Sequence, residues 1–216
     1  MQQHIIKQLT DVGLAHSSKT ISSLAEFLGL LTKWNEVHNL TAITEPEDMI
    51  KRHLVESLAL ASFLKGNRIA DVGSGGGMPG IPLAIAEPDR QFTLVESRSK
   101  RVSFLRHVSG VLNLENVIVE HARVEELPAI LPFETVLARA VAPLPDLLKL
   151  TGHLFAPGTI LLALTGESFV GDSASFEGGY RACRAVGPFT DLLNGSLVVV
   201  QKDSELAGYD QEDCDS

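Results

Sequence analysis

The spacing of apolar residues divides the chain into a helical beginning and a longer part in which strands and helices alternate. In Thr20–Leu40, apolar residues recur every three to four positions, which is the period of one helix face. Glu47–Leu64 is predicted as a second helix, because Pro46 suits a helix start and Gly66 follows as a stop. We therefore expect residues 1–65 to form an N-terminal helical extension packed on a core.

From Asn67 onward, short apolar runs alternate with helical stretches. The runs predicted to be strands are Arg68–Val72, Gln91–Glu96, Asn116–Glu120, Thr135–Ala138, Thr159–Leu164 and Leu197–Val200. The stretches predicted to be helices are Ile81–Ala86, Arg98–Leu112 and Leu144–Leu154. Residues 165–190 are rich in Gly and Ser and are expected to be loops with short elements. This alternation predicts an α/β fold over residues 66–202, with a doubly wound, mostly parallel sheet covered on both faces.

Composition and charge change this picture little. The chain has 216 residues, of which 44% are hydrophobic and 21% charged, as in ordinary globular domains. The formal net charge is −9, but six acidic residues and no Lys or Arg lie in residues 203–216, which are predicted to be an acidic, disordered tail. Residues 1–150 carry 15 basic against 17 acidic residues, so the net charge does not exclude a nucleic-acid partner.

Cysteine usage and hydropathy indicate where the protein works. The two cysteines, Cys183 and Cys214, form neither a disulfide framework nor a zinc-ligand spacing, so we expect no metal and a reducing compartment. The longest apolar run, Ile160–Leu164, is too short to cross a bilayer, and the first residues lack the apolar stretch of a secretory signal. A cytoplasmic protein without a membrane segment is the expectation.

The strongest chemical signal is the segment Asp-Val-Gly-Ser-Gly-Gly-Gly-Met-Pro-Gly at residues 71–80. It follows a predicted strand and precedes a helix, which is the context of a ligand-binding glycine loop. Two registers compete. The spacing of Gly75, Gly77 and Gly80 fits the dinucleotide-binding pattern. The spacing of Gly73, Gly75 and Gly77 after an aspartate instead fits the loop with which Rossmann-like methyltransferases hold S-adenosylmethionine.

Glu96 supports a nucleoside cofactor in either register. It ends the second predicted strand, 19 residues after Gly77, where a carboxylate accepts both hydroxyls of a ribose. This feature serves NAD and S-adenosylmethionine equally. The plainer alternative is a tight glycine turn and a solvated strand end. The chain also lacks the Asn/Asp-Pro-Pro-aromatic motif of exocyclic-amine methylases, a Pro-Cys pair and a P-loop, which favours a nucleophile that needs no base.

Several short motifs make the chain resemble the RsmG family, also called glucose-inhibited division protein B, of bacterial 16S rRNA guanine-N7 methyltransferases. The motifs, spread over residues 20–165, are Trp34-Asn35, Asn39–Ile43, Arg52-His53, Glu56–Leu58, Asp71–Pro82, Glu96-Ser97, Lys100-Arg101, Arg123–Glu126 and Arg139-Ala140. The Gly-Met-Pro-Gly-Ile-Pro extension of the glycine loop separates this family from other methyltransferases. The resemblance implies a Rossmann-like class I fold and methylation of N7 of guanosine 527 in 16S rRNA, with S-adenosylmethionine as donor.

The resemblance also implies roles for individual positions. Gly73 and Met78 would line the cofactor, Val124 and Glu125 would meet its adenine, and Arg139 would close the pocket from the end of the fourth strand. The RNA would be presented in the 30S subunit or an assembly intermediate, to a monomeric enzyme.

Two positions depart from the family pattern. Glu56 stands where the family often has Asp before Ser-Leu, and Thr165 stands where it often has Lys before Gly. If that lysine helps to hold RNA, another base must take its role in this chain.

Because N7 of guanine carries a lone pair and no proton at neutral pH, we assign no catalytic base. The candidates on the substrate side are Arg52, His53 and Arg139. Two of them have a plainer alternative: His53, on a helix, is more often a hydrogen-bonded packing residue, and Arg139, at a strand end, can be a buried partner of an acid.

RNA contact would come from local positive charge. The segment Ser97–His107 holds four bases and no acid, and we single out Arg98, Lys100 and Arg101 there, with Lys51 in a second cluster. A solvated helix face is the alternative. Two other functions also stay open at this stage: an NAD-dependent oxidoreductase, and a non-catalytic ribosome-assembly factor on a cofactor-binding fold.

Overall fold

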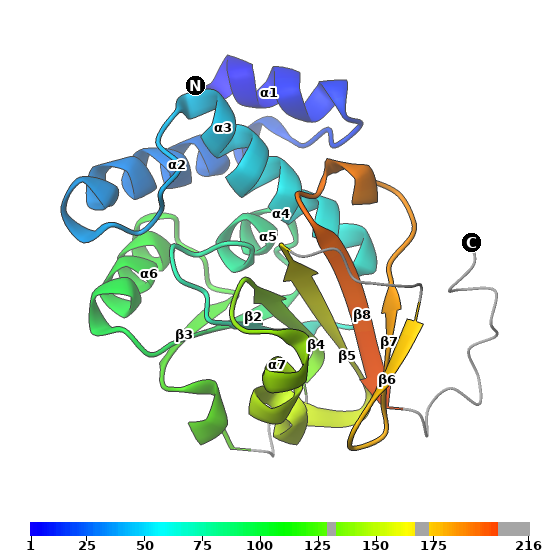
Figure 1. Cartoon of the computed structure of the whole chain (residues 1–216). Coiled ribbons are helices and arrows are strands. Elements are labelled where there is room, and N and C mark those ends of the chain that lie inside the picture. The colour runs from blue at the N-terminus through cyan, green and yellow to red at the C-terminus, as the bar shows by residue number, and fades with distance from the viewer. Residues whose placement is uncertain (129–132, 167–172, 203–216) are drawn as a thin grey trace.

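A twisted sheet forms the centre of the molecule (Figure 1). The computed structural model describes residues 1–128, 133–166 and 173–202, and within them the sheet has eight strands in the order β3-β2-β1-β4-β5-β8-β7-β6. The strands are β1 Arg68–Val72, β2 Gln91–Glu96, β3 Val117–His121, β4 Phe133–Arg139, β5 Phe155–Thr165, β6 Ser173–Phe176, β7 Tyr180–Arg184 and β8 Ser196–Lys202. The predicted acidic tail, 203–216, lies outside the described residues.

Strand directions place a ligand-binding edge at β1 and β4. Strands β1 to β5 are mutually parallel, with β2 and β3 on one side of β1 and β4 and β5 on the other. The carboxyl ends of β1 and β4 therefore meet where the strand order reverses, and ligands of open α/β sheets bind at that switch point. The mostly parallel, doubly wound sheet is confirmed.

The far end of the sheet is antiparallel and differs from the expectation. Strand β8 runs antiparallel to β5, and β7 runs antiparallel to both β8 and β6. Strands β6 and β7 form a hairpin inside a region predicted as loops, although residues 167–172 of that region are not described. Gly178 and Gly179, at φ 88° and 71°, make the turn. Strands of four and five residues are too short for their alternation to stand out in a sequence.

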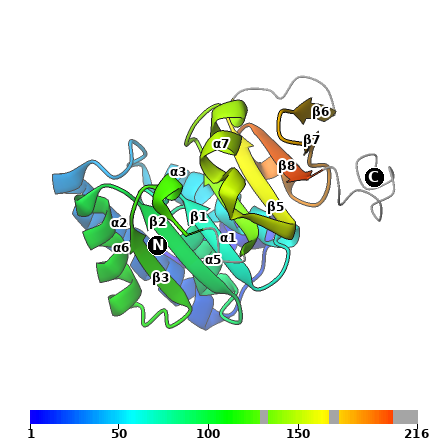
Figure 2. The same ribbon diagram turned by 90° about the horizontal axis from the view of Figure 1, so that it is seen from below.

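Helices cover the two faces of the sheet, each over its own hydrophobic cluster. One face carries α1 Gln2–Asp11, α2 Ser18–His38, α3 Pro46–Met49, α4 Glu56–Ala59, α5 Gly80–Ala86 and α6 Ser99–Val111. The other carries α7 Leu144–Thr151 and the short 3-10 turns η3 Val124–Glu126 and η4 Gly152–Leu154. Figure 2 shows α5 and α7 on opposite sides of the sheet. Within the described residues, no helix is both long and apolar enough to span a bilayer.

Alternate residues of the strands supply these two clusters. Ile69, Leu94 and Leu137 belong to the cluster that also contains residues of the N-terminal helices, whereas Ala70 and Val136 belong to the cluster under α7. All five are at most 1% exposed. Because α2 contributes its apolar stripe to the first cluster, the N-terminal helices and the sheet are joined by one continuous core.

The second predicted helix is present, but it is not uniform. It begins as α3, continues as a π-helical turn η1 over Ile50–Val55, returns to α-helix in α4 and ends as a 3-10 turn η2 over Leu60–Phe63. Apolar spacing predicts that a helix exists, but it does not reveal a π turn, which needs contacts from outside the helix to be stable.

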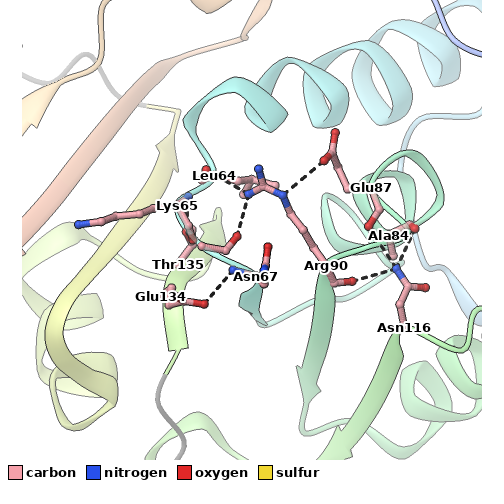
Figure 3. A network of polar contacts seen from close by, with 10 residues as sticks. Leu64, Lys65, Asn67, Ala84, Glu87, Arg90, Asn116, Glu134 and Thr135 are labelled. Atoms are coloured by element: carbon pink, nitrogen blue, oxygen red, sulfur yellow. Dashed lines mark hydrogen bonds and ion pairs between the residues drawn. The ribbon is translucent and has the colours of Figure 1, made fainter.

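A network of polar contacts ties the end of this helical region to the amino edge of the sheet (Figure 3). Thr135 and Lys65 exchange two hydrogen bonds, of 2.7 and 2.8 Å, between the threonine hydroxyl and the lysine backbone. The Glu134 carboxylate accepts the backbone N–H of Asn67 at 2.8 Å, and Arg90 donates to the carbonyl of Leu64 at 3.0 Å. At the edge of the sheet opposite the glycine loop, these polar groups are thus hydrogen-bonded to one another.

Candidate active site

The glycine loop leaves β1 with a backbone that side chains would obstruct. Gly73, Gly75 and Gly77 have φ of 69°, 57° and 88°, a region that residues with a Cβ rarely adopt. The N–H groups of Gly73 and Ser74 donate to the carbonyl of Val95 at 2.9 and 3.2 Å, which ties the start of the loop to β2. The loop therefore lies along the carboxyl edge of β1 and β2, as the sequence predicts.

Asp71, in β1, holds the end of the glycine loop at Gly80. Its buried carboxylate accepts the N–H of Gly80 at 3.1 Å, and its carbonyl accepts the Ser74 hydroxyl at 2.8 Å. Burial raises the pKa of Asp71 to about 7, and the hydrogen bond from Gly80 opposes that rise. A Cβ at Gly80 would collide with the side chain of Leu94, so α5 approaches the sheet closely there. Asp71, the aspartate of the methyltransferase pattern, thus stabilises the conformation of the glycine loop.

Glu96 stands at the end of β2 with its carboxylate already oriented. One oxygen accepts the N–H of Gly75 at 3.0 Å, and the other accepts the N–H of Arg98 at 2.8 Å. The guanidinium of Arg101 lies 3.7 Å from the first oxygen. Each carboxylate oxygen accepts about two hydrogen bonds, so both retain capacity for a ribose hydroxyl. The residues present therefore fit the nucleoside part of S-adenosylmethionine.

A contact that the sequence did not suggest joins the two loops at the switch point. Val141 lies two residues after the end of β4 and is 37% exposed, and a Cβ built on Gly73 would lie only 2.9 Å from its methyl group. Ala140, between Arg139 and Val141, has a left-handed φ of 53°, which is unusual for a residue other than glycine. The only sign of this contact in the sequence was an apolar residue, Val141, shortly after a predicted strand that is followed by Arg139.

The other residues proposed for the cofactor lie around this edge. Val124 is buried in the cluster under α7, while Glu125 is exposed on η3, which follows β3. Met78 is half-buried against the cluster of the N-terminal helices, and its methyl group lies 3.1 Å from a Cβ built on Gly76. Their contacts with a cofactor stay predictions.

Arg139 and Arg52 share a buried acid. Glu56 is 1% exposed, and its carboxylate lies 2.9 Å from Nε of Arg52 and 3.3 Å from Nη2 of Arg139. Nη1 of Arg139 also donates to the carbonyl of Arg52 at 2.9 Å. Burial raises the pKa of Glu56, and the two guanidinium charges oppose this. Arg139 is thus paired with a buried acid, and its contact with a cofactor or substrate stays a prediction.

His53 is a packing residue. It is 2% exposed, and its Nε2 lies 3.0 Å from the hydroxyl of Thr41. Burial and the nearby positive charge of Arg139 lower the pKa of His53 to about 4, so the ring is neutral at pH 7. Its burial leaves it no surface for direct contact with a substrate.

The shifted pKa of His53 predicts a loss of stability in acid. A histidine that is neutral in the folded chain stabilises it above its unfolded pKa of 6.5, and that contribution disappears as the pH falls toward about 4. We expect this one group to remove about 3 kcal/mol from the free energy of unfolding over that window. Urea unfolding at about pH 7.5 and about pH 4.5 measures it. His53→Gln should lose less stability than the wild type; an equal loss would contradict the prediction.

The predicted RNA-binding bases fall into two groups. Arg98 and Lys100 are exposed at the start of α6, and Lys51 is exposed on η1. Arg101 instead lies against Glu96 at the cofactor edge.

Thr165, at the end of β5, donates its hydroxyl to the carbonyl of Ser196 at 3.4 Å. Among residues 1–128, 133–166 and 173–202, no group of three or more His, Cys, Asp or Glu could hold a metal ion.

The strand order, the glycine loop and the acid that ends β2 form a Rossmann-like nucleoside site, and the comparisons place the fold among class I S-adenosylmethionine-dependent methyltransferases. Solved structures share the fold. A methyltransferase from Geobacter sulfurreducens has a TM-score of 0.56 at 13% identity, over 82% of this chain and 88% of its own. A putative protein-L-isoaspartate O-methyltransferase from Plasmodium falciparum, solved with S-adenosyl-L-homocysteine, has a TM-score of 0.51 at 15% identity, over 84% and 89%.

Sequence comparison identifies the family. The GidB family model, described as rRNA small subunit methyltransferase G, matches residues 20–187. Proteins named ribosomal RNA small subunit methyltransferase G are 38% identical in Klebsiella pneumoniae strain 342, over 94% of this chain and 100% of the relative, and 42% identical in Escherichia fergusonii, over 89% and 94%. The relative in Legionella pneumophila strain Corby is 46% identical over 75% and 79%. The chain belongs to the GidB family of rRNA methyltransferases.

This membership decides between the two registers of the glycine loop. The chain is an enzyme of a methyltransferase family, so its cofactor is the methyl donor S-adenosylmethionine and not the hydride carrier NAD. The oxidoreductase alternative is therefore wrong.

Proposed function

We propose that this enzyme methylates N7 of guanosine 527 of 16S rRNA, in the 30S subunit or an assembly intermediate. The observation that carries the proposal is Glu96, oriented by the N–H groups of Gly75 and Arg98 at the switch point of the sheet, in a chain of this rRNA methyltransferase family. We also propose that it works as a cytoplasmic monomer without a metal ion, with residues 1–65 as an extension of the core 66–202.

Backbone and carboxylate groups would hold the cofactor. Gly73, Gly75 and Gly77 bring the backbone close to the methionine part, and Glu96 accepts the ribose hydroxyls. Val124 and Glu125 would contact the adenine, with Met78 and Arg139 at the borders of the pocket.

The chemistry asks little of the protein beyond position. S-adenosylmethionine supplies an electrophilic methyl group, and N7 of guanine offers a lone pair that needs no deprotonation. The chain must then align the base in line with the methyl group, which by itself removes much of the barrier. The buried, neutral His53 is consistent with this, since no general base is required.

Methyl transfer to 30S subunits tests the proposal. We expect tritium from labelled S-adenosylmethionine to appear in 16S rRNA of subunits that lack this modification, on N7 of guanosine 527 after nucleoside analysis. A label on another nucleotide would refute the site. Binding of 30S subunits without transfer would favour the assembly-factor alternative.

The exposed bases predict a salt dependence. Replacing Arg98 and Lys100 by Ala should weaken binding of 30S subunits and reduce the slope of log affinity against log salt by roughly 0.7–0.9 per lost phosphate contact. Lys149→Ala is the control, because Lys149 is also exposed but pairs with Asp146 within α7, on the face of the sheet opposite α6. An unchanged slope in the double variant would show that Arg98 and Lys100 contact no phosphate and that the start of α6 is an ordinary solvated surface.

A further inference from the structure

We infer that Glu56 is a positioning residue that holds Arg139 at the cofactor edge of the sheet. The inference rests on the proposed role of Arg139 in the cofactor pocket. It names the residue that keeps the Arg139 guanidinium in place for that role. The two residues are 83 positions apart in the sequence and meet through Glu56 Oε2 and Arg139 Nη2 at 3.3 Å.

The contacts of Arg139 leave part of its guanidinium for a ligand. Nη1 donates a hydrogen bond to the carbonyl of Arg52, and Nη2 forms an ion pair with Glu56, so most of the five N–H groups remain for a ligand. The side chain is 18% exposed and stands at the end of β4, next to the switch point of the sheet. A guanidinium fixed at two points is well suited to a carboxylate, such as that of the methionine part of the cofactor.

An irregular turn of the helix supplies both fixed points. The N–H of Glu56 bonds to the carbonyl of Lys51, five residues back, instead of to the carbonyl of Arg52 as in a regular α-helix. The Arg52 carbonyl accepts from Arg139 instead. The π turn over Ile50–Val55 therefore presents one carbonyl and one carboxylate to the same guanidinium.

Charge explains why the acid matters. Arg52 and Arg139 both approach Glu56, and Asp71 is a second acid whose charge acts on Arg139. Without the Glu56 charge, the two guanidinium groups repel each other, and Arg139 keeps only the Arg52 carbonyl. The arginine is then free to turn away from the pocket.

The test measures the affinity of the purified chain for S-adenosyl-L-homocysteine by calorimetry. Glu56→Gln should lower it by about 10-fold or more, the usual loss for a charged hydrogen bond. Glu56→Asp, which keeps the charge, should stay closer to the wild type. A role in packing alone predicts the reverse order, because Gln has the shape of Glu and Asp does not. Finding that reverse order would overturn the inference.

A double-mutant cycle shows whether Glu56 acts through Arg139. Arg139→Met should lower the affinity, and adding Glu56→Gln to it should lower it little further. Additive losses would overturn the inference. Glu134→Gln is the matched control, since Glu134 is also a paired carboxylate but lies at the amino edge of the sheet. Unfolding midpoints of all variants establish that each one folds.

The remaining outcomes separate the inference from the proposed function. If Arg139→Met lowers the affinity and folded Glu56→Gln does not, the inference is overturned and the cofactor site stands. If neither changes it, Arg139 is not in the pocket and the inference fails, while methyl transfer to 30S subunits still decides the function. Should Glu56→Gln not fold, Glu56→Asp takes its place in the cycle: a loss of affinity that is just as large in the Arg139→Met background would overturn the inference.

Discussion

Gly75→Val is expected to lose at least about 100-fold in affinity for S-adenosylmethionine while the chain keeps its fold. Gly75 has a φ of 57°, where a β-branched residue is strained, and its N–H orients the Glu96 carboxylate. Losing the loop conformation and that carboxylate together removes more than one charged hydrogen bond to the ligand. Calorimetry measures the affinity, and the unfolding midpoint reports the fold.

Two glycines make the result interpretable. A Cβ at Gly75 meets its nearest atom, on Arg101, at 3.5 Å, whereas one at Gly77 lies 2.8 Å from Ile81, so Gly77→Val should damage the fold itself. Gly110→Val is the neutral control, because a Cβ there meets nothing within 4 Å. Wild-type affinity in folded Gly75→Val would remove the loop from the cofactor site.

Glu96→Ala is expected to weaken S-adenosylmethionine binding by about 1–3 kcal/mol. The variant removes the acceptors of the ribose hydroxyls and also leaves the N–H groups of Gly75 and Arg98 without their acceptor. Calorimetry again measures the change, with Glu134→Ala at the opposite edge of the sheet as control. A dissociation constant equal to that of the wild type, at an unchanged unfolding midpoint, would exclude Glu96 from the site.

The pairing of Arg101 with Glu96 changes how the RNA surface must be tested. The sequence places Arg101 with Arg98 and Lys100 in one basic cluster, because it shows only that the three are close along the chain. In the structure Arg101 lies 3.7 Å from the Glu96 carboxylate, so replacing it would alter the cofactor edge as well. Only the two bases that are exposed report on RNA by themselves.

Local patterns explain what could be predicted from the sequence. The bounds of β1 and β2 agree with the prediction, and the glycine loop and Glu96 meet at one edge, because a strand, a turn and a strand end are encoded by adjacent residues. The contacts of Arg139 were not predictable, since Arg52 is 87 positions away and reaches it only through a π turn. The strands β6 and β7 could be expected only as short elements among loops, because four and five residues show too little alternation to mark a strand.

The shared core of the N-terminal helices and the sheet sets how this enzyme unfolds. Ile69, Leu94 and Leu137 share one hydrophobic cluster with helices from the first third of the chain, so removing those helices would expose part of this cluster to water. The two parts should consequently melt in a single cooperative transition rather than one after the other. Substitutions in these helices are therefore tolerated only if they keep the shared cluster buried.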